Sequence, residues 1–263
     1  MLFEHISVLT PEGIVPDRCV AIRGPRIASI TAAAPEGSWP ERYDGRGKLL
    51  LPGFVNAHSH TPMTLMRGYG ENLALSRWLN KRIFPFEALL TPEDIYWATL
   101  LGIAEMVRYG ITSTSDMYFR LDAVARAFAE AGAKVNLSNG TTCFDGTPYA
   151  QLASTAETHA AVRDWQGAQD GRIRVDVSLH GEYTSDEATA RAVAEDAARL
   201  GCRVQVHMSE TKQEHEACKG RHGGRTPARY LADCGLFEMP AIAAHCVWAQ
   251  DEDFALLAEK GVT

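Results

Sequence analysis

The sequence lacks the features that would assign it to a membrane, secreted or disulfide-stapled class. No apolar stretch approaches the ~18 residues that a membrane helix needs. The first residues show no basic segment followed by an apolar one, so no signal peptide is expected. The six cysteines form no Cys-x-x-Cys pair and follow no regular spacing. Scattered thiols of this kind favour a reducing cytoplasm.

Positive charge is also scarce. The 263 residues contain 26 Lys and Arg against 33 Asp and Glu, a net charge of −7. A nucleic-acid-binding surface would need basic patches, so we expect neither nucleic acid nor membrane as a partner. A hydrophobic fraction of 46% with 22% charged residues is typical of a globular chain and excludes disorder as the main state. We expect a small-molecule substrate and leave homo-oligomer formation open.

The first fifty residues predict a small β unit, residues 1–52. Short apolar or β-branched runs are separated by turn signals such as Pro11-Glu12-Gly13 and Gly24-Pro25. The expected strands are Leu2–Leu9, Cys19–Arg23, Arg26–Ile30 and Lys48–Leu51. The segment 35–47, with two prolines and three glycines, is interpreted as a loop.

From residue 53 onward, strand-like runs alternate with helical patterns. The expected strands are Gly53–Ala57, Ile111–Ser115, Lys134–Ser138, Ile173–Leu179, Arg203–Val206 and Ala241–Ala244. The expected helices are Pro92–Tyr109, Asp122–Ala131, Tyr149–Trp165, Asp186–Leu200, Arg225–Cys234 and Asp251–Lys260. This alternation predicts an α/β fold with a parallel sheet. We count six βα units over residues 53–263, with the start of a seventh at 261–263. An eight-unit barrel takes about 250 residues alone, so we expect the front part of a longer protein.

Five of the nine histidines fall where predicted strands end, which is where parallel α/β folds gather their active sites. His58 and His60 are two residues apart on a strand and therefore point to the same face. His207 ends another strand and completes three nitrogens, the protein ligand number common in catalytic zinc sites. Glu210 follows three residues later, where a carboxylate can act as a proton shuttle. Its plainer interpretation is an acid at a helix start.

Three further residues end predicted strands without a settled role. His245 is interpreted as a metal ligand or as a group that orients water, and His180 as a hydrogen-bond partner of the substrate. Asp116 is either a satisfied polar residue or part of the site. The other four histidines (5, 159, 215 and 222) are interpreted as surface residues.

At this point the combined motifs resemble the amidohydrolase superfamily. They are LLPGFVNAHSHTPMTLMRGYGENLALSRWL, HMSET and AAHCVW. The most similar branch is that of the 5-methylthioadenosine/S-adenosylhomocysteine deaminases and their triazine-hydrolase relatives. The resemblance covers the whole chain. It implies a (β/α)8 barrel of the metal-dependent hydrolase kind beside a β-sandwich built from both chain ends, so residues 1–52 would be part of that sandwich and residues 53–263 the first six βα units of the barrel.

The resemblance also implies roles residue by residue. The metal ligands would be His58, His60 and His207. Glu210 would protonate the ring nitrogen, and His245 would hydrogen-bond the attacking water. The substrate would contact Trp78, Glu87 and His180. Of these, Glu87 would bind the ribose hydroxyls. Asn139 lies near the end of strand three, where this branch has an arginine for its nucleoside substrates. Because the arginine is missing, other amino-purines, pteridines and triazines stay possible substrates.

Together these observations predict a metal-dependent hydrolytic deaminase of an amino-substituted N-heterocycle. Zinc, with iron as the alternative, would lower the pKa of bound water toward ~7, and the resulting hydroxide would attack the ring carbon. Strand four carries no lysine, so a single ion per site is expected. The alternatives are a dechlorinase, N-dealkylase or cyclic amidase of the same fold, or an inactive fragment. The family's Asp at the end of strand eight is absent, so we expect this chain to be catalytically incomplete.

Overall fold

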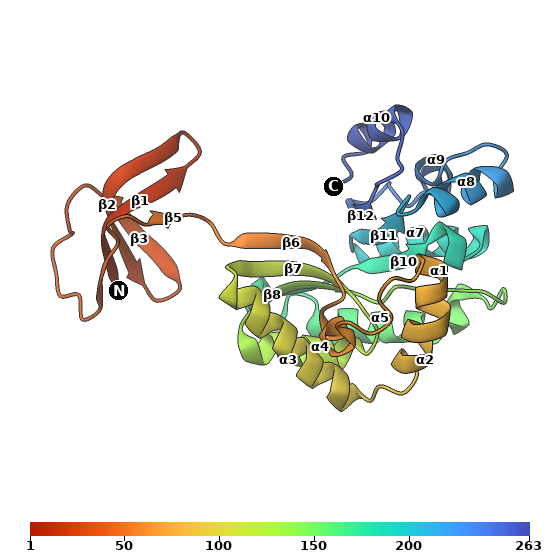
Figure 1. Cartoon of the computed structure of the whole chain (residues 1–263), viewed down its shortest axis with the longest axis horizontal. Coiled ribbons are helices and arrows are strands. Elements are labelled where there is room, and N and C mark those ends of the chain that lie inside the picture. The colour runs from red at the N-terminus through yellow and green to blue at the C-terminus, as the bar shows by residue number, and fades with distance from the viewer. The chain divides into compact units, whose positions relative to one another are not determined.

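The computed structural model describes residues 1–263, which divide into two compact units, Met1–Phe54 and Val55–Thr263. The first unit is all β, whereas the second alternates strands and helices (Figure 1). No helix combines the length and the apolar character needed to cross a membrane. All residues predicted to form the site belong to the second unit.

The first unit is a five-stranded sheet. Its strands are β1 (Leu2–Thr10), β2 (Gly13–Arg23), β3 (Arg26–Thr31), β4 (Arg42–Asp44) and β5 (Leu49–Leu50). β1 pairs antiparallel with β2 and parallel with β4 and β5, and β2 pairs antiparallel with β3. The predicted strands are confirmed with shifted ends. Segment 35–47 is not all loop, because β4 pairs with the edge of β1 although its three residues are exposed and show no alternation.

The second unit contains the six predicted strands in chain order, as a (β/α) barrel requires. They are β6 (Phe54–Ser59), β7 (Ile111–Met117), β8 (Lys134–Ser138), β9 (Ile173–Val175) continued by β10 (Val177–Gly181), β11 (Val204–Met208) and β12 (Ala241–His245). The pairs β7–β8, β8–β9, β10–β11 and β11–β12 are parallel. A bridge between Thr141 and Leu179 joins the two sheets. Thr263 bonds through its backbone to Ala241 and Ala243, where a seventh strand was predicted to start.

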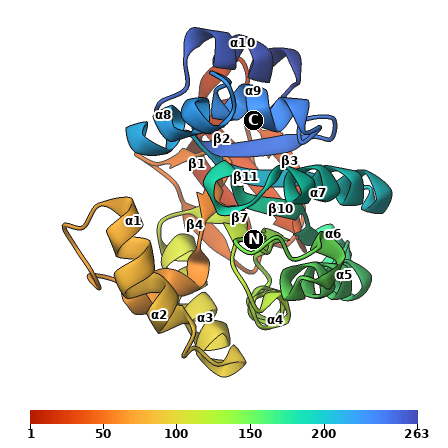
Figure 2. The same cartoon turned by 90° about the vertical axis from the view of Figure 1, so that its right-hand side faces the viewer.

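The predicted helices lie between the strands and pack against them (Figure 2). They are α3 (Pro92–Arg108), α4 (Leu121–Ala131), α5 (Ala153–Trp165), α7 (Glu187–Leu200), α9 (Pro227–Asp233) and α10 (Asp251–Glu259). A short 3-10 turn, η3 (Tyr149–Gln151), replaces the start predicted for α5. The start signal of α3 forms a capping box between Thr91 and Asp94, with Pro92 at its first position. Gly132 and Gly201 end α4 and α7 with positive φ angles, as helix-stopping glycines do.

Several helical segments were not predicted. They are η1 (Thr61–Met66), α1 (Leu75–Trp78), the π-helical turn η2 (Leu79–Ile83), α2 (Phe84–Glu87), α6 (Ala168–Gly171), η4 (Glu182–Thr184) and α8 (Lys212–Arg221). Most are too short to show a helical period. α8 has ten residues, but its sequence KQEHEACKGR is polar on almost every side.

The core of the second unit lies between strands and outer helices. One cluster packs Leu137 and Val175 of the sheet against Val124 and Phe128 of α4. Another packs Leu179 and Val206 against α7 and α9. The apolar residues within the strands form this core. The residues at the carboxyl ends of the strands lie outside it and carry polar side chains at one rim.

Candidate active site

The structure brings five histidines together at the carboxyl ends of the strands, and we call this set the histidine rim. Its members are His58, His60, His180, His207 and His245. The centre of the His207 ring lies 4.8 Å from that of His58 and 4.7 Å from that of His180. The His58 ring centre lies 4.8 Å from that of His60 and 5.0 Å from that of His245. Parallel strands end at the same rim, which explains how residues so distant in sequence meet.

The nitrogens of the rim fit a metal ion. The possible ligand atoms of His58, His207 and His245 all lie within 4.8 Å of one another. Nε2 of His58 and Nε2 of His207 are buried without a hydrogen-bond partner. A buried nitrogen without a partner is costly, and a bound cation would remove that cost. The structure thus groups His245 with two of the three predicted ligands, His58 and His207, whereas His60 lies outside this group.

His60 is oriented from behind by strand β7. Its Nδ1 lies 2.5 Å from the carbonyl oxygen of Met117. A carbonyl oxygen can only accept, so Nδ1 donates and Nε2 keeps its lone pair. This is the usual arrangement behind a metal-ligating histidine, whose second nitrogen is held by a carbonyl or carboxylate.

Burial favours the neutral form of three rim histidines. Together with the nearby His60, His245 and His180, it lowers the pKa of His58 to about 3. Burial likewise lowers the pKa of His180 to about 4 and that of His207 well below its usual value. Neutral imidazole is the form that binds a metal, so His58, His180 and His207 are in the metal-binding form at neutral pH.

Glu210 stands beside the rim at the end of β11. One of its carboxylate oxygens lies 3.7 Å from Nε2 of His245. The two chain turns that bring these groups together contain left-handed residues, with φ angles of 50° at Ser209, 78° at His245 and 54° at Cys246. Such conformations cost about 1–3 kcal/mol each for non-glycine residues and cluster at functional sites.

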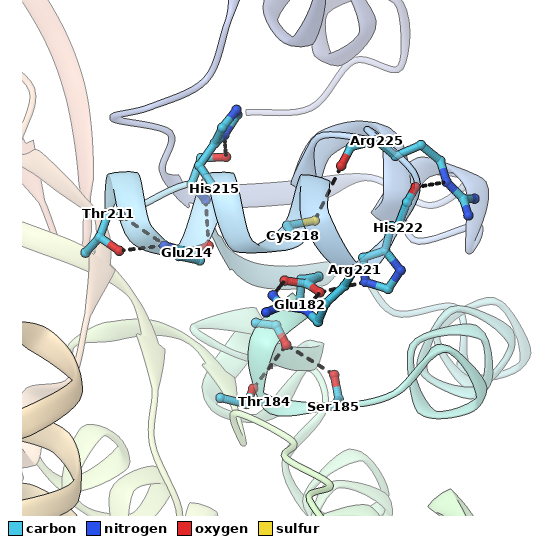
Figure 3. Close-up of polar contacts among 12 residues, drawn as sticks. Glu182, Thr184, Ser185, Thr211, Glu214, His215, Cys218, Arg221, His222 and Arg225 are labelled. Carbon is cyan, nitrogen blue, oxygen red and sulfur yellow. Dashed lines mark hydrogen bonds and ion pairs between the residues drawn. The ribbon is translucent and has the colours of Figure 1, made fainter.

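The backbone of Glu210 is fixed by a residue that the sequence analysis missed. Glu214, in the first turn of α8, accepts hydrogen bonds from the backbone N–H of Ser209 (2.9 Å), Glu210 (2.9 Å) and Thr211 (3.3 Å). Figure 3 shows Glu214 next to Thr211. Burial raises the pKa of Glu214, and these three N–H donors oppose that shift. The spacing Thr211-x-x-Glu214 is a capping-box signature and would have revealed both the helix and its acid.

The predicted substrate residues share one cavity next to the rim. The cavity measures about 270 Å³, and its lining includes His60, Trp78, Glu87, Asn139 and His180. Burial raises the pKa of Glu87, while neighbouring Tyr118 and His60 oppose the shift. The Asn139 amide already donates to Glu157, so Asn139 borders the cavity with its amide engaged elsewhere.

The sequence predicts a surface position for His215, and this prediction is wrong. Its side chain is buried, and Nδ1 lies 3.1 Å from Oγ of Ser209. The reason is the unpredicted helix α8, which places His215 against the turn that carries Glu210. His222 is half-buried and bonded to Glu182 (Figure 3).

The strand order and the histidine rim define an α/β barrel protein whose site lies at the carboxyl ends of its strands. The chain belongs to the amidohydrolase family, whose model matches residues 49–263, so the predicted membership is confirmed. It is 39% identical over its whole length to a 5-methylthioadenosine/S-adenosylhomocysteine deaminase of Pelotomaculum thermopropionicum, and 38% identical over 98% of its length to a 5'-deoxyadenosine deaminase of Methanothermobacter thermautotrophicus. The chain spans 61% of the length of each of these relatives.

The fold is similar to that of a crystal structure of an adenosine deaminase from Xanthomonas campestris with bound zinc. The TM-score is 0.81 at 29% identity, and the match covers 99% of this chain and 61% of the other. This similarity confirms the predicted fold class.

Proposed function

We propose that this chain forms the metal-binding part of a hydrolytic deaminase that acts on an amino-substituted N-heterocycle, with adenosine derivatives as the substrate class. The observation that carries the proposal is the convergence of unpaired, neutral histidine nitrogens with Glu210 beside a cavity lined by Trp78 and Glu87. The relatives named as adenosine-derivative deaminases support the substrate class.

The residues that would hold one zinc ion are His58, His60 and His207. Ligand atoms of His58, His207 and His245 lie within 4.8 Å of one another, and the His60 ring centre lies 5.2 Å from that of His207. Bound zinc would supply Lewis acidity that lowers the pKa of a water molecule toward ~7. The zinc in the similar adenosine deaminase structure supports zinc over iron.

The chain's own residues would hold the ring and move the protons. Trp78 offers a flat face to the heterocycle, and the Glu87 carboxylate can accept bonds from sugar hydroxyls in the same cavity. His245 would orient the attacking water, and Glu210 would carry a proton to the ring nitrogen and then to the leaving amine. The ring carbon gains an oxygen from water and loses its amino group as ammonia, so atoms and charge balance.

The proposal extends to organisation and compartment. Residues 1–52 would be part of a β-sandwich and residues 53–263 the first six units of the barrel. The six cysteines are all free thiols, which supports a reducing compartment. Small molecules are the proposed partners.

The test is ammonia release from adenosine, 5'-deoxyadenosine, 5-methylthioadenosine, S-adenosylhomocysteine and guanine, measured on the zinc-loaded chain and on a zinc-loaded version extended by its downstream coding sequence to the length of the relatives. We expect the extended version to release ammonia from at least one adenosine derivative, and the 263-residue chain to release little or none. Ammonia from none of them, together with chloride or alkylamine release from substituted triazines, would replace the deaminase proposal by the dechlorinase or dealkylase alternative.

A further inference from the structure

The residue before the last of strand β7 is a carboxylate that is almost completely enclosed. Asp116 is 1% exposed, and it lies on the strand next to β6, which delivers His58. Its oxygen Oδ1 accepts bonds from Thr61 N (2.6 Å), Thr61 Oγ1 (2.7 Å) and Ser59 Oγ (3.0 Å). The other oxygen, Oδ2, is buried without a partner.

These bonds bracket a histidine of the rim. Ser59 and Thr61 are the two neighbours of His60 in the chain, so one oxygen atom holds the side chain of one neighbour and the backbone N–H of the other. The next residue of β7, Met117, holds the His60 ring through its carbonyl oxygen. Two consecutive residues of one strand therefore fix both the position and the ring direction of His60.

We propose that Asp116 is the positioning residue of the metal centre: through Oδ1 it fixes the segment that carries His58 and His60, and so sets how well these histidines fit one ion. This inference rests on the proposed metal site. The proposal assigns a role to Asp116. The sequence alone allowed two interpretations of this residue, a satisfied polar residue or a part of the site.

A merely structural carboxylate is available in the same unit for comparison. Asp176, between β9 and β10, is also 1% exposed. It is bonded to Arg203 at 3.1 Å and to Gln205 at 2.9 Å, and it makes no hydrogen bond to a residue of the histidine rim or its chain neighbours. Asp116 and Asp176 thus match in burial and charge and differ in what they hold.

The experiment measures the zinc dissociation constant by competition with a chromophoric chelator, after each variant has been shown to fold by circular dichroism. Asp116→Ala should weaken zinc binding by ~10–100-fold, the usual cost of losing a contact behind a metal ligand. Asp116→Asn should bind zinc within a few-fold of the unaltered chain, because its carbonyl oxygen can accept the same three bonds. Asp176→Ala should leave the zinc dissociation constant unchanged.

Three results would overturn the proposal. Equal zinc affinity of Asp116→Ala and the unaltered chain would leave Asp116 a structural role only. An Asp116→Asn variant as weak as Asp116→Ala would show that the charge or Oδ2 acts directly, not the positioning bonds. An equal loss of zinc affinity in Asp176→Ala would show a general effect of removing a buried carboxylate.

Two further measurements cover variants that do not fold and a failure of the proposed function. Thr61→Val removes only one of the three bonds and should weaken zinc binding in the same direction by a smaller factor; an unchanged affinity contradicts the proposal. If the unaltered chain binds no zinc, the metal centre itself is contradicted. Nitrogen NMR of the imidazole rings in the metal-free chain then decides separately whether Asp116→Ala, unlike Asp176→Ala, disorders His58 and His60.

Discussion

The molecule contains two clusters of metal-ligand side chains, and they differ in how their polar atoms are used. In the histidine rim, ring nitrogens of His58 and His207 are buried with no partner. In the second cluster, which we call the α8 cluster, Glu182, Cys218 and His222 also bring their ligand atoms within 4.8 Å of one another. Proximity alone therefore does not distinguish the two.

In the α8 cluster every ligand group already has a partner. The buried Glu182 carboxylate accepts Arg221 Nε at 3.0 Å and Arg221 Nη2 at 2.6 Å, and His222 Nε2 lies 2.7 Å away (Figure 3). The Cys218 thiol points at the carbonyl oxygen of Arg225, 3.7 Å away. A cation would have to displace the Arg221 guanidinium. The comparison teaches that the proposed metal centre differs from the α8 cluster by combining clustered ligand atoms with unpaired nitrogens. Neither feature is enough alone, since His215 Nε2 is also buried without a partner but belongs to no such cluster.

The largest expected effect comes from removing a rim nitrogen. His207→Ala should reduce zinc affinity by more than the ~10–100-fold that a supporting contact costs, because a ligand itself is lost. Cys218→Ala, the matched change in the α8 cluster, should keep the unaltered affinity. The measurement is zinc content after gel filtration and a chelator titration. Zinc loss in both variants would refute the distinction between the clusters.

Removing the carboxylate beside the rim should separate binding from turnover. In the version extended to the length of the relatives, Glu210→Gln should retain zinc and lower ammonia release by at least ~10²-fold, the scale of general acid–base catalysis. Glu216→Gln, an exposed acid on α8, is the control and should match the unaltered chain. The measurement is initial rate with metal content determined on the same sample. A Glu210→Gln rate near that of the control would rule out the acid–base role.

Breaking the α8 cluster should affect stability and not zinc. Arg221→Gln leaves the buried Glu182 with a weaker set of partners, so we expect a loss of about 1–3 kcal/mol in the free energy of unfolding. Arg163→Gln breaks only the exposed ion pair with Asp164 and should change it by no more than ~0.5 kcal/mol. Urea unfolding measures both. Equal stability of the two variants would show that the Glu182 network contributes nothing to the fold.

The sequence predicted the rim well because a strand end is encoded locally. An apolar run followed by His58, His207 or His245 places the side chain at the rim once the strands are parallel. Trp78 and Glu87 could be placed only by resemblance, since the short helices α1 and α2 show no period. Helix α8 was missed because it is polar on almost every side. Consequently the sequence did not predict that His215 is buried, or that the Glu214 carboxylate accepts a hydrogen bond from the backbone N–H of Glu210.

The burial of Asp116 illustrates a further limit of sequence analysis. A polar residue ending a strand has the same local pattern whether it is exposed or enclosed. Only the packing of β6 against β7 shows that Oδ1 holds the neighbours of His60. Non-local hydrogen bonds of this kind, between residues more than fifty positions apart, leave no signal in a single sequence.

The last expected effect is a pH dependence of the stability of the metal-free chain, to which the rim histidines contribute. The pKa of His58 is lowered to about 3 and that of His180 to about 4, whereas an unfolded histidine titrates near ~6.5. Above ~6.5 both states are neutral, and stability does not depend on these groups. Below pH ~6.5 the unfolded chain binds protons at these two histidines, whereas the folded chain does not. The free energy of unfolding therefore falls as the pH falls, until the pH reaches the pKa values of the folded chain.

Urea midpoints between about pH 7.5 and about pH 4.5 test this dependence. Carboxylates also titrate toward the acid end, so the unaltered chain must be compared with His180→Gln, which keeps every carboxylate and loses one buried imidazole. The variant should lose less stability on acidification, because one group fewer takes up a proton on unfolding. Parallel curves for the two proteins would mean that His180 is protonated as readily in the folded chain as in the unfolded one. The rim would then not hold this histidine neutral, and the contrast between unpaired rim nitrogens and the paired α8 cluster would lose its electrostatic basis.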